Sequence, residues 1–158
     1  MGADMHADLL PLRFLLGTWR GAGKGEYPTI EPFDYQEEMR FEDVGDAFLV
    51  YEQSSWSPVD RSPIHLERGF LRPGRDGHIE LVLAHPIGLT EVSEGPLVGT
   101  TFELTSRDVA RTSTGLDATS LVRRYRVDGD DMSYRTDMAT QRTAMALHLR
   151  GELRRVPG

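Results

Sequence analysis

The chain has 158 residues, of which 39% are hydrophobic and 27% are charged. This length favours a single domain spanning residues 1–158, since chains usually divide only beyond roughly 250 residues, and it excludes a full α/β barrel of roughly 200 residues or more. The 18 basic and 25 acidic residues give a net charge of −7, which argues against nucleic acid as a partner. Because the chain has no cysteine, disulfides, catalytic thiolates and zinc–thiolate sites are excluded.

Targeting signals are not evident. No apolar run approaches the roughly 18 residues that a membrane-spanning helix needs, so no membrane partner is expected. The first residues carry no basic n-region, and position six is His rather than Ser or Thr, which argues against a secretory signal and against myristoylation. We therefore expect a cytoplasmic protein. The sequence leaves a monomer and a homodimer open.

Short strands separated by turns follow one another along almost the whole chain. Residues 33–42 alternate between apolar and polar side chains, with Phe33 and Tyr35 on the apolar face, which is typical of a strand with one solvated face. A helical signal is confined to His6–Leu16, where Pro11 limits it to one or two turns. The segment 145–155 is ambiguous between strand and helix. In chain order, the other expected strands are 19–25, 47–56, 64–72, 78–85, 89–94, 100–106, 118–127 and 131–139.

These consecutive hairpins predict an all-β fold. About ten strands without helical crossovers favour a closed, antiparallel, up-and-down barrel, similar to that of the lipocalins and with a short N-terminal helical turn, because closure removes exposed strand edges. A β-sandwich is the alternative. A barrel of this strand number can hold one small ligand, provided that side chains do not fill its lumen.

The glycine-rich segment 17–25 matches neither common nucleotide-binding pattern. Thr18 and Gly25 stand where a P-loop requires glycine and a hydroxyl residue, and Glu26 stands where the third glycine of a dinucleotide-binding turn belongs. Alternate glycines on a strand instead indicate a tight bend, or the close approach of a ligand or another backbone. Trp19 is then expected to close the base of the barrel.

Histidines are the remaining candidates for metal or cofactor ligation. None forms an i, i+4 pair on a helix, so a zinc site would have to be built from residues distant in sequence. No Gly-x-Ser-x-Gly elbow occurs, so a hydrolase triad is not indicated. His148 is ambiguous, because Leu147 and Leu149 occupy the opposite phase of the same segment. If the leucines pack inward, His148 lies outside, and if the lumen is a ligand cavity, the reverse holds. The five histidines are His6, His65, His78, His85 and His148.

The glycine segment continues into a second motif, so that Gly17-x-Trp19-x-Gly21-x-Gly23 is followed by Tyr27-Pro-Thr29-Ile30. Together these motifs resemble the nitrobindins, which are small haem-binding β-barrel proteins. Similarity extends through residues 64–72, 83–89 and 125–134. The resemblance implies a ten-stranded antiparallel barrel that binds one haem b per chain, with His148 as the axial ligand of the iron. It also implies the following pocket residues: Thr29, Ile30, Ile64, His65, His85 and Met138.

The same resemblance implies a function. Nitrobindins bind nitric oxide at ferrous haem and isomerise peroxynitrite to nitrate at five-coordinate ferric haem, whose free sixth position accepts a small ligand. The iron does this chemistry, so no catalytic side chain is expected. Three alternatives remain at this point: a lipocalin-like carrier of an apolar small molecule, a nitric oxide sensor, and a structural barrel with a filled lumen.

Overall fold

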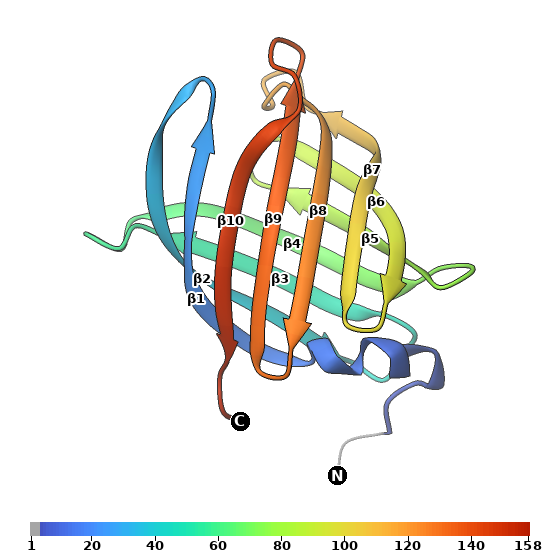
Figure 1. Cartoon of the computed structure of the whole chain (residues 1–158). Coiled ribbons are helices and arrows are strands. Elements are labelled where there is room, and N and C mark those ends of the chain that lie inside the picture. Colours follow the sequence, from blue (N-terminus) through green and yellow to red (C-terminus); the bar gives the residue numbers. More distant parts are fainter. Residues whose placement is uncertain (1–3) are drawn as a thin grey trace.

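The computed structural model describes residues 4–158, which form a closed barrel of ten antiparallel strands preceded by one short helix (Figure 1). Each strand pairs with its neighbours in sequence, and β1 closes the barrel by pairing with β10. The expected fold class is confirmed, and the ambiguous C-terminal segment is a strand. The elements are η1 (Ala7–Leu15), β1 (Gly17–Tyr27), β2 (Ile30–Asp43), β3 (Leu49–Trp56), β4 (Pro63–Pro73), β5 (His78–His85), β6 (Leu89–Val98), β7 (Thr101–Arg111), β8 (Ala118–Asp128), β9 (Asp131–Thr140) and β10 (Ala146–Arg155).

Several strands are longer than the sequence predicted. β6 continues through Gly95 and Pro96, past the expected end at residue 94. It turns at Gly99, whose φ of +62° lies in the left-handed region that suits a two-residue hairpin loop. Proline and glycine therefore do not end this strand, because the chain reverses only where the backbone conformation of a tight turn is available.

The N-terminal helix covers the base of the barrel. η1 is a 3-10 helix of nine residues with Pro11 inside it, so it runs further than the one or two turns expected. Leu9, Leu12 and Leu15 recur every third residue, which matches the three residues per turn of a 3-10 helix, and each is at most 1% exposed. This buried leucine stripe explains why the helix persists through the proline.

Trp19 closes the base from the barrel side, as predicted. Its side chain is fully buried, and its indole N–H donates a hydrogen bond of 2.9 Å to the carbonyl oxygen of Leu15. The guanidinium of Arg155 lies 4.2 Å from the centre of the Trp19 ring, a distance suited to a cation–π contact. Helix η1, strand β1 and strand β10 are thus joined at one end of the barrel.

The glycines of β1 allow close packing of the barrel wall. A Cβ atom on Gly21 would overlap with the carbonyl oxygen of Glu152 on β10, and one on Gly23 would overlap with the ring of Tyr35. The glycine pattern therefore reflects the close approach of a backbone and an aromatic ring, one of the two explanations that the sequence offered.

Apolar side chains fill the lumen near η1. They form a buried cluster that includes residues of the helix and of most strands, whereas a smaller cluster around Leu121 and Met138 lies towards the other end. No helix in the described residues 4–158 is long and apolar enough to cross a membrane. The principal buried side chains of the base are Leu12, Trp19, Met39, Phe41, Leu49, Leu71, Leu81, Phe102, Leu104, Tyr125, Met132 and Leu153.

Candidate functional site

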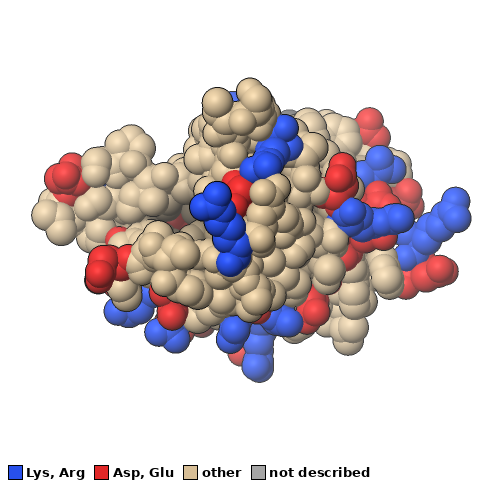
Figure 2. All heavy atoms as spheres, turned by 90° about the horizontal axis from the view of Figure 1, so that it is seen from above, with Lys and Arg blue, Asp and Glu red and all other residues tan. Residues whose placement is uncertain are grey.

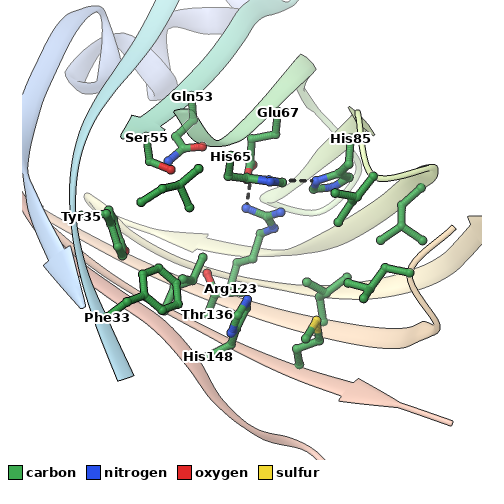
Figure 3. Close-up of a pocket in the computed structure, with 17 residues that line it drawn as sticks. Phe33, Tyr35, Gln53, Ser55, His65, Glu67, His85, Arg123, Thr136 and His148 are labelled. Atoms are coloured by element: carbon green, nitrogen blue, oxygen red, sulfur yellow. Dashed lines mark hydrogen bonds and ion pairs between the residues drawn. The ribbon is translucent and has the colours of Figure 1, made fainter. Parts of the chain in front are cut away.

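A cavity occupies the end of the barrel away from η1 (Figure 3). Three apolar residues at its rim, Ile64, Ile87 and Leu116, are between 40% and 44% exposed. Viewed from this end, uncharged surface covers much of the face, with charged side chains of both signs around its periphery and a few near its middle (Figure 2). The cavity is lined by Phe33, Tyr35, Gln53, Ser55, Ile64, His65, Glu67, His85, Ile87, Leu89, Leu116, Leu121, Arg123, Thr136, Met138, His148 and Leu149.

His148 enters the cavity at an irregularity of β10. Leu147 pairs with Asp137 of β9 and Leu149 pairs with Thr136, so His148 is an extra residue between two consecutive pairs. Such a β-bulge shifts the alternation of side chains by one residue. His148 and Leu149, although adjacent in sequence, therefore both line the cavity, and Leu147 does not. The sequence pattern had offered only two alternatives, with either His148 or both leucines facing inward. The structure corrects this, because His148 and Leu149 both face the cavity.

The imidazole of His148 is held in one orientation by its surroundings. Its Nδ1 lies 3.1 Å from the carbonyl oxygen of Glu26. Because a carbonyl oxygen only accepts, Nδ1 carries the proton, and Nε2 of the neutral ring keeps its lone pair. The ring meets Tyr27 edge-on at 5.5 Å, and the Tyr27 hydroxyl donates to the carbonyl oxygen of Met138 at 3.0 Å.

Burial also keeps His148 uncharged. It lowers the pKa of the imidazole below its ordinary value, because the charged form loses hydration, and this outweighs the opposing effect of the hydrogen bond to Glu26. A neutral imidazole whose N–H is bound to a carbonyl oxygen is the usual form of a metal-ligating histidine. The structure therefore leaves His148 Nε2, on the cavity wall, suited to bind a metal ion.

Two further histidines lie on the opposite wall. In the strand order of the barrel, β5 is five strands from β10 in either direction. His85 ends β5, and its Nδ1 is 3.2 Å from Nε2 of His65 on β4 (Figure 3). The same His65 nitrogen is 3.4 Å from Oε1 of Glu67, and His85 Nε2 is 3.2 Å from Oε1 of Glu91. The two rings are thus connected to each other and to two buried carboxylates.

Arg123 joins these carboxylates across the lumen. From β8 its guanidinium donates to Glu67 at 2.8 Å and to Glu91 at 2.8 and 2.9 Å. Burial alone would raise the pKa of Glu67, but the positive charge of Arg123 and contacts with the histidines outweigh it and lower the pKa to about 2. The pKa of Glu91 is lowered for similar reasons. Tyr51 and Ser93 donate further hydrogen bonds of 3.1 and 2.6 Å to the carboxylates. With both carboxylates ionised, they and Arg123 carry a net charge of −1.

A third carboxyl group, Glu37, is buried without a cation beside it. It is fully buried and accepts hydrogen bonds from Tyr134 at 2.8 Å and Gln53 at 3.0 Å. The hydroxyl of Tyr35 lies 2.5 Å from that of Tyr134 and extends this chain towards the cavity. Burial, the dominant cause, raises the pKa of Glu37 to about 7. Glu37 is therefore partly protonated at neutral pH.

The structure brings most of the predicted pocket residues together. Thr29 and Ile30 are the exceptions: they are exposed at the tip of the β1–β2 hairpin and line a separate surface hollow that Met138 and His148 also border. Their role in binding stays a prediction. The predicted residues that line the main cavity are Ile64, His65, His85, Met138 and His148.

Sequence reasoning gave no role to the charged residues of the lumen. Each of them falls in phase with the buried residues of its strand: Glu37 lies between Tyr35 and Met39, and Arg123 lies between Leu121 and Tyr125. A charged residue at an apolar position of an alternating strand was the signal that could have identified them. The same signal marks Glu67 and Glu91, which share the buried phase of β4 and β6.

Comparisons with known proteins agree with this geometry. The family described as THAP4-like, heme-binding beta-barrel domain matches residues 8–155. "Peroxynitrite isomerase 2" of Mycobacterium marinum is 45% identical over 159 aligned residues, covering 98% of this chain and 99% of the relative. "Peroxynitrite isomerase" of Nocardia farcinica is also 45% identical, over 96% of this chain and 92% of that protein.

A solved structure shares the architecture. The crystal structure of Rv2717c from M. tuberculosis superimposes with a TM-score of 0.91 at 41% sequence identity, covering 98% of this chain and all of that chain. Matches of this extent include the barrel, the glycine-rich strand and the segment that carries His148. The chain is therefore a member of the nitrobindin family of THAP4-like, haem-binding β-barrel domains.

Proposed function

We propose that the protein binds one haem b in its cavity, with His148 Nε2 as the axial ligand, and isomerises peroxynitrite to nitrate. The observation that carries the proposal is the state of His148, which is neutral, protonated at Nδ1 by virtue of Glu26, and placed on the cavity wall by a β-bulge. The printed names of the relatives support the activity.

The residues of the cavity fit a planar, largely apolar cofactor. Leu121, Met138 and Leu149 give the wall on the His148 side an apolar surface. The rim residues Ile64 and Leu116 remain substantially exposed, and a haem in the mouth would shield them from water. Both the donor atom and its surroundings therefore suit haem better than a hydrated metal ion at this wall.

A bound haem would supply an iron with one open coordination position, at which a small anion such as peroxynitrite can be polarised and rearranged. The protein's own residues orient and shield the histidine that would hold this iron. Glu26 fixes the ring of His148 through Nδ1, and Leu121 and Leu149 exclude water beside it. On the far wall, His65 and His85 are hydrogen-bonded to each other, so these two rings would leave a bound haem to be held by His148.

The same open position supports nitric oxide binding by the ferrous protein. Nitric oxide binding changes the absorption spectrum without forming nitrate, so the two activities can be measured separately. A protein that binds nitric oxide but leaves peroxynitrite decay unchanged would act as a carrier or sensor.

The test uses the haem-loaded full-length protein and the variant His148→Ala. We expect an intense Soret band that is lost in His148→Ala while the far-UV circular dichroism of the barrel is retained. In stopped-flow measurements, peroxynitrite decay should accelerate in proportion to the ferric protein, with nitrate rather than nitrite as the product, and cyanide should suppress it.

His78→Ala is the matched control, because His78 is exposed at the start of β5 and does not line the cavity. It should retain the Soret band and the acceleration. An unchanged Soret band in His148→Ala would refute the ligand assignment. Decay at the buffer rate with fully haem-loaded protein would refute the isomerase activity.

A further inference from the structure

Three donor atoms converge on the wall opposite His148. They belong to His65, His85 and Glu67, each of which offers one ligand atom within 4.8 Å of the others, and their contacts run through Nε2 of His65, Nδ1 of His85 and Oε1 of Glu67. Nε2 of His65 is 3.2 Å from the His85 nitrogen and 3.4 Å from the Glu67 oxygen. Ligands about 2.1 Å from one tetrahedral zinc ion are separated by similar distances. The three side chains are thus arranged around a common point.

The groups behind these donors orient them as in a metal site. The other ring nitrogen of His85, Nε2, lies 3.2 Å from the carboxylate of Glu91 and donates its proton to it. Nδ1 therefore has a lone pair, which faces His65. The second oxygen of Glu67 is held by Arg123 at 2.8 Å and Tyr51 at 3.1 Å, so Oε1, 3.4 Å from Nε2 of His65, is the oxygen that faces the two histidines. Second-shell hydrogen bonds of this kind are characteristic of histidine and carboxylate ligands.

The local charge favours a cation. Glu67 and Glu91 are buried, and Arg123 compensates only one of their two negative charges. The cluster also borders the cavity, so a fourth ligand, such as water or a small anion, could reach the ion. Arg123 opposes a nearby cation, but its guanidinium contacts Oε2 of Glu67 rather than the converging Oε1.

We propose that His65, His85 and Glu67 form a second metal site, which binds a divalent transition-metal cation such as Zn²⁺ and keeps one coordination position open to the cavity. Two histidines and one carboxylate are a donor set used both by catalytic zinc and by non-haem Fe²⁺. The hydrogen bond between the rings needs one proton between them. On metal binding this proton moves to Nδ1 of His65, so that both rings stay neutral. The site does not involve His148, although it borders the cavity proposed above to hold the haem.

The probes are Co²⁺ and Zn²⁺, added to the full-length protein without haem so that no Soret band obscures the spectrum. Co²⁺ should give a saturable visible ligand-field spectrum at one equivalent, and Zn²⁺ should displace it. His65→Ala and Glu67→Gln remove a ligand each, and their affinity should fall by more than the roughly 10–100-fold typical of outer-shell changes. Circular dichroism establishes that each variant is folded, and His65→Asn replaces His65→Ala if the latter is not.

Two single-histidine variants are the controls. His78→Ala removes an exposed histidine of β5, and His148→Ala removes the histidine of the opposite wall. Both should bind Co²⁺ with the affinity of the unaltered protein. The proposal is overturned if no saturable spectrum forms, if His65→Ala and Glu67→Gln bind as tightly as the controls, or if the spectrum disappears in His148→Ala instead.

Discussion

The base and the mouth of this barrel are built on the same ten strands but are filled in opposite ways. At the base, Trp19 and Leu12 belong to an apolar cluster that excludes water. At the mouth, Arg123 joins two buried carboxylates, while apolar Ile87 and Leu116 are exposed at the rim. Buried charge and exposed apolar surface both destabilise a protein unless something compensates them.

This contrast assigns different tasks to the two ends. The ten strands close into one barrel, although β7 and β8 pair only over Thr101–Thr105 and Val122–Arg126, so the side chains inside can differ between the two ends without opening the barrel. Packing around η1 supplies stability at the base. The mouth can then retain features that suit a ligand: an uncharged histidine, a charged cluster and an incompletely covered apolar rim.

The largest expected effect is at the base. Trp19→Ala removes a fully buried ring, its hydrogen bond to Leu15 and its contact with Arg155. We expect it to reduce the free energy of unfolding by about 3–5 kcal/mol, as measured by urea denaturation. Trp56→Ala is the control, since Trp56 is only half-buried, and it should cost clearly less. Equal losses in the two variants would mean that the base does not dominate stability.

The second effect concerns Glu37, between the two regions. Its folded-state pKa is raised from 4.5 to about 7, so the folded protein holds its proton more tightly than the unfolded chain does. As the pH rises from about 4.5 to about 7, this group therefore lowers the free energy of unfolding, by at most on the order of 3 kcal/mol. Outside that window the contribution is constant.

Glu37→Gln tests this pH dependence. Glutamine can accept the hydrogen bonds from Tyr134 and Gln53 but does not ionise. The free energy of unfolding is measured at pH 4.5 and at pH 7.5 for both proteins. The variant should be the more stable at pH 7.5 relative to its own stability at pH 4.5, because it lacks the loss that Glu37 causes. Identical pH dependence in the two proteins would show that Glu37 is not the group responsible.

The smallest effect on stability is expected at the rim. Leu116→Ser replaces a side chain that is 40% exposed, so the haem-free protein should change by less than about 0.5 kcal/mol. Haem affinity should nevertheless fall by roughly 1 kcal/mol, or about five-fold, because apolar contact with the ligand is lost. Haem transfer to a competing apo-protein measures this difference. If the variant is less stable but binds haem with unaltered affinity, the rim contributes to stability and not to binding. This would contradict the assignment of stability to the base and ligand binding to the mouth.

Much of the fold could be predicted from local patterns. Strict alternation in residues 33–42 and the Asp-Gly turn near residue 129 identify strands and hairpins, because a strand repeats every two residues and a tight turn needs particular backbone angles. Strand ends were less predictable, since pairing with a neighbour carried β6 through Gly95 and Pro96. Family resemblance, rather than periodicity, identified His148 and the other pocket residues. The haem contacts of Thr29 and Ile30 remain predictions.

By itself, the sequence determined an all-β chain of about ten strands with Trp19 at its base, because alternation, turn residues and buried aromatic rings act over short stretches of chain. Only the tertiary structure decided what faces the cavity. The β-bulge at His148 depends on how β10 pairs with β9, and the contact between Arg123 and Glu67 joins residues 56 positions apart. The alternation of residues along one strand predicts neither the bulge nor this contact, because both depend on the strand register and the closure of the whole barrel.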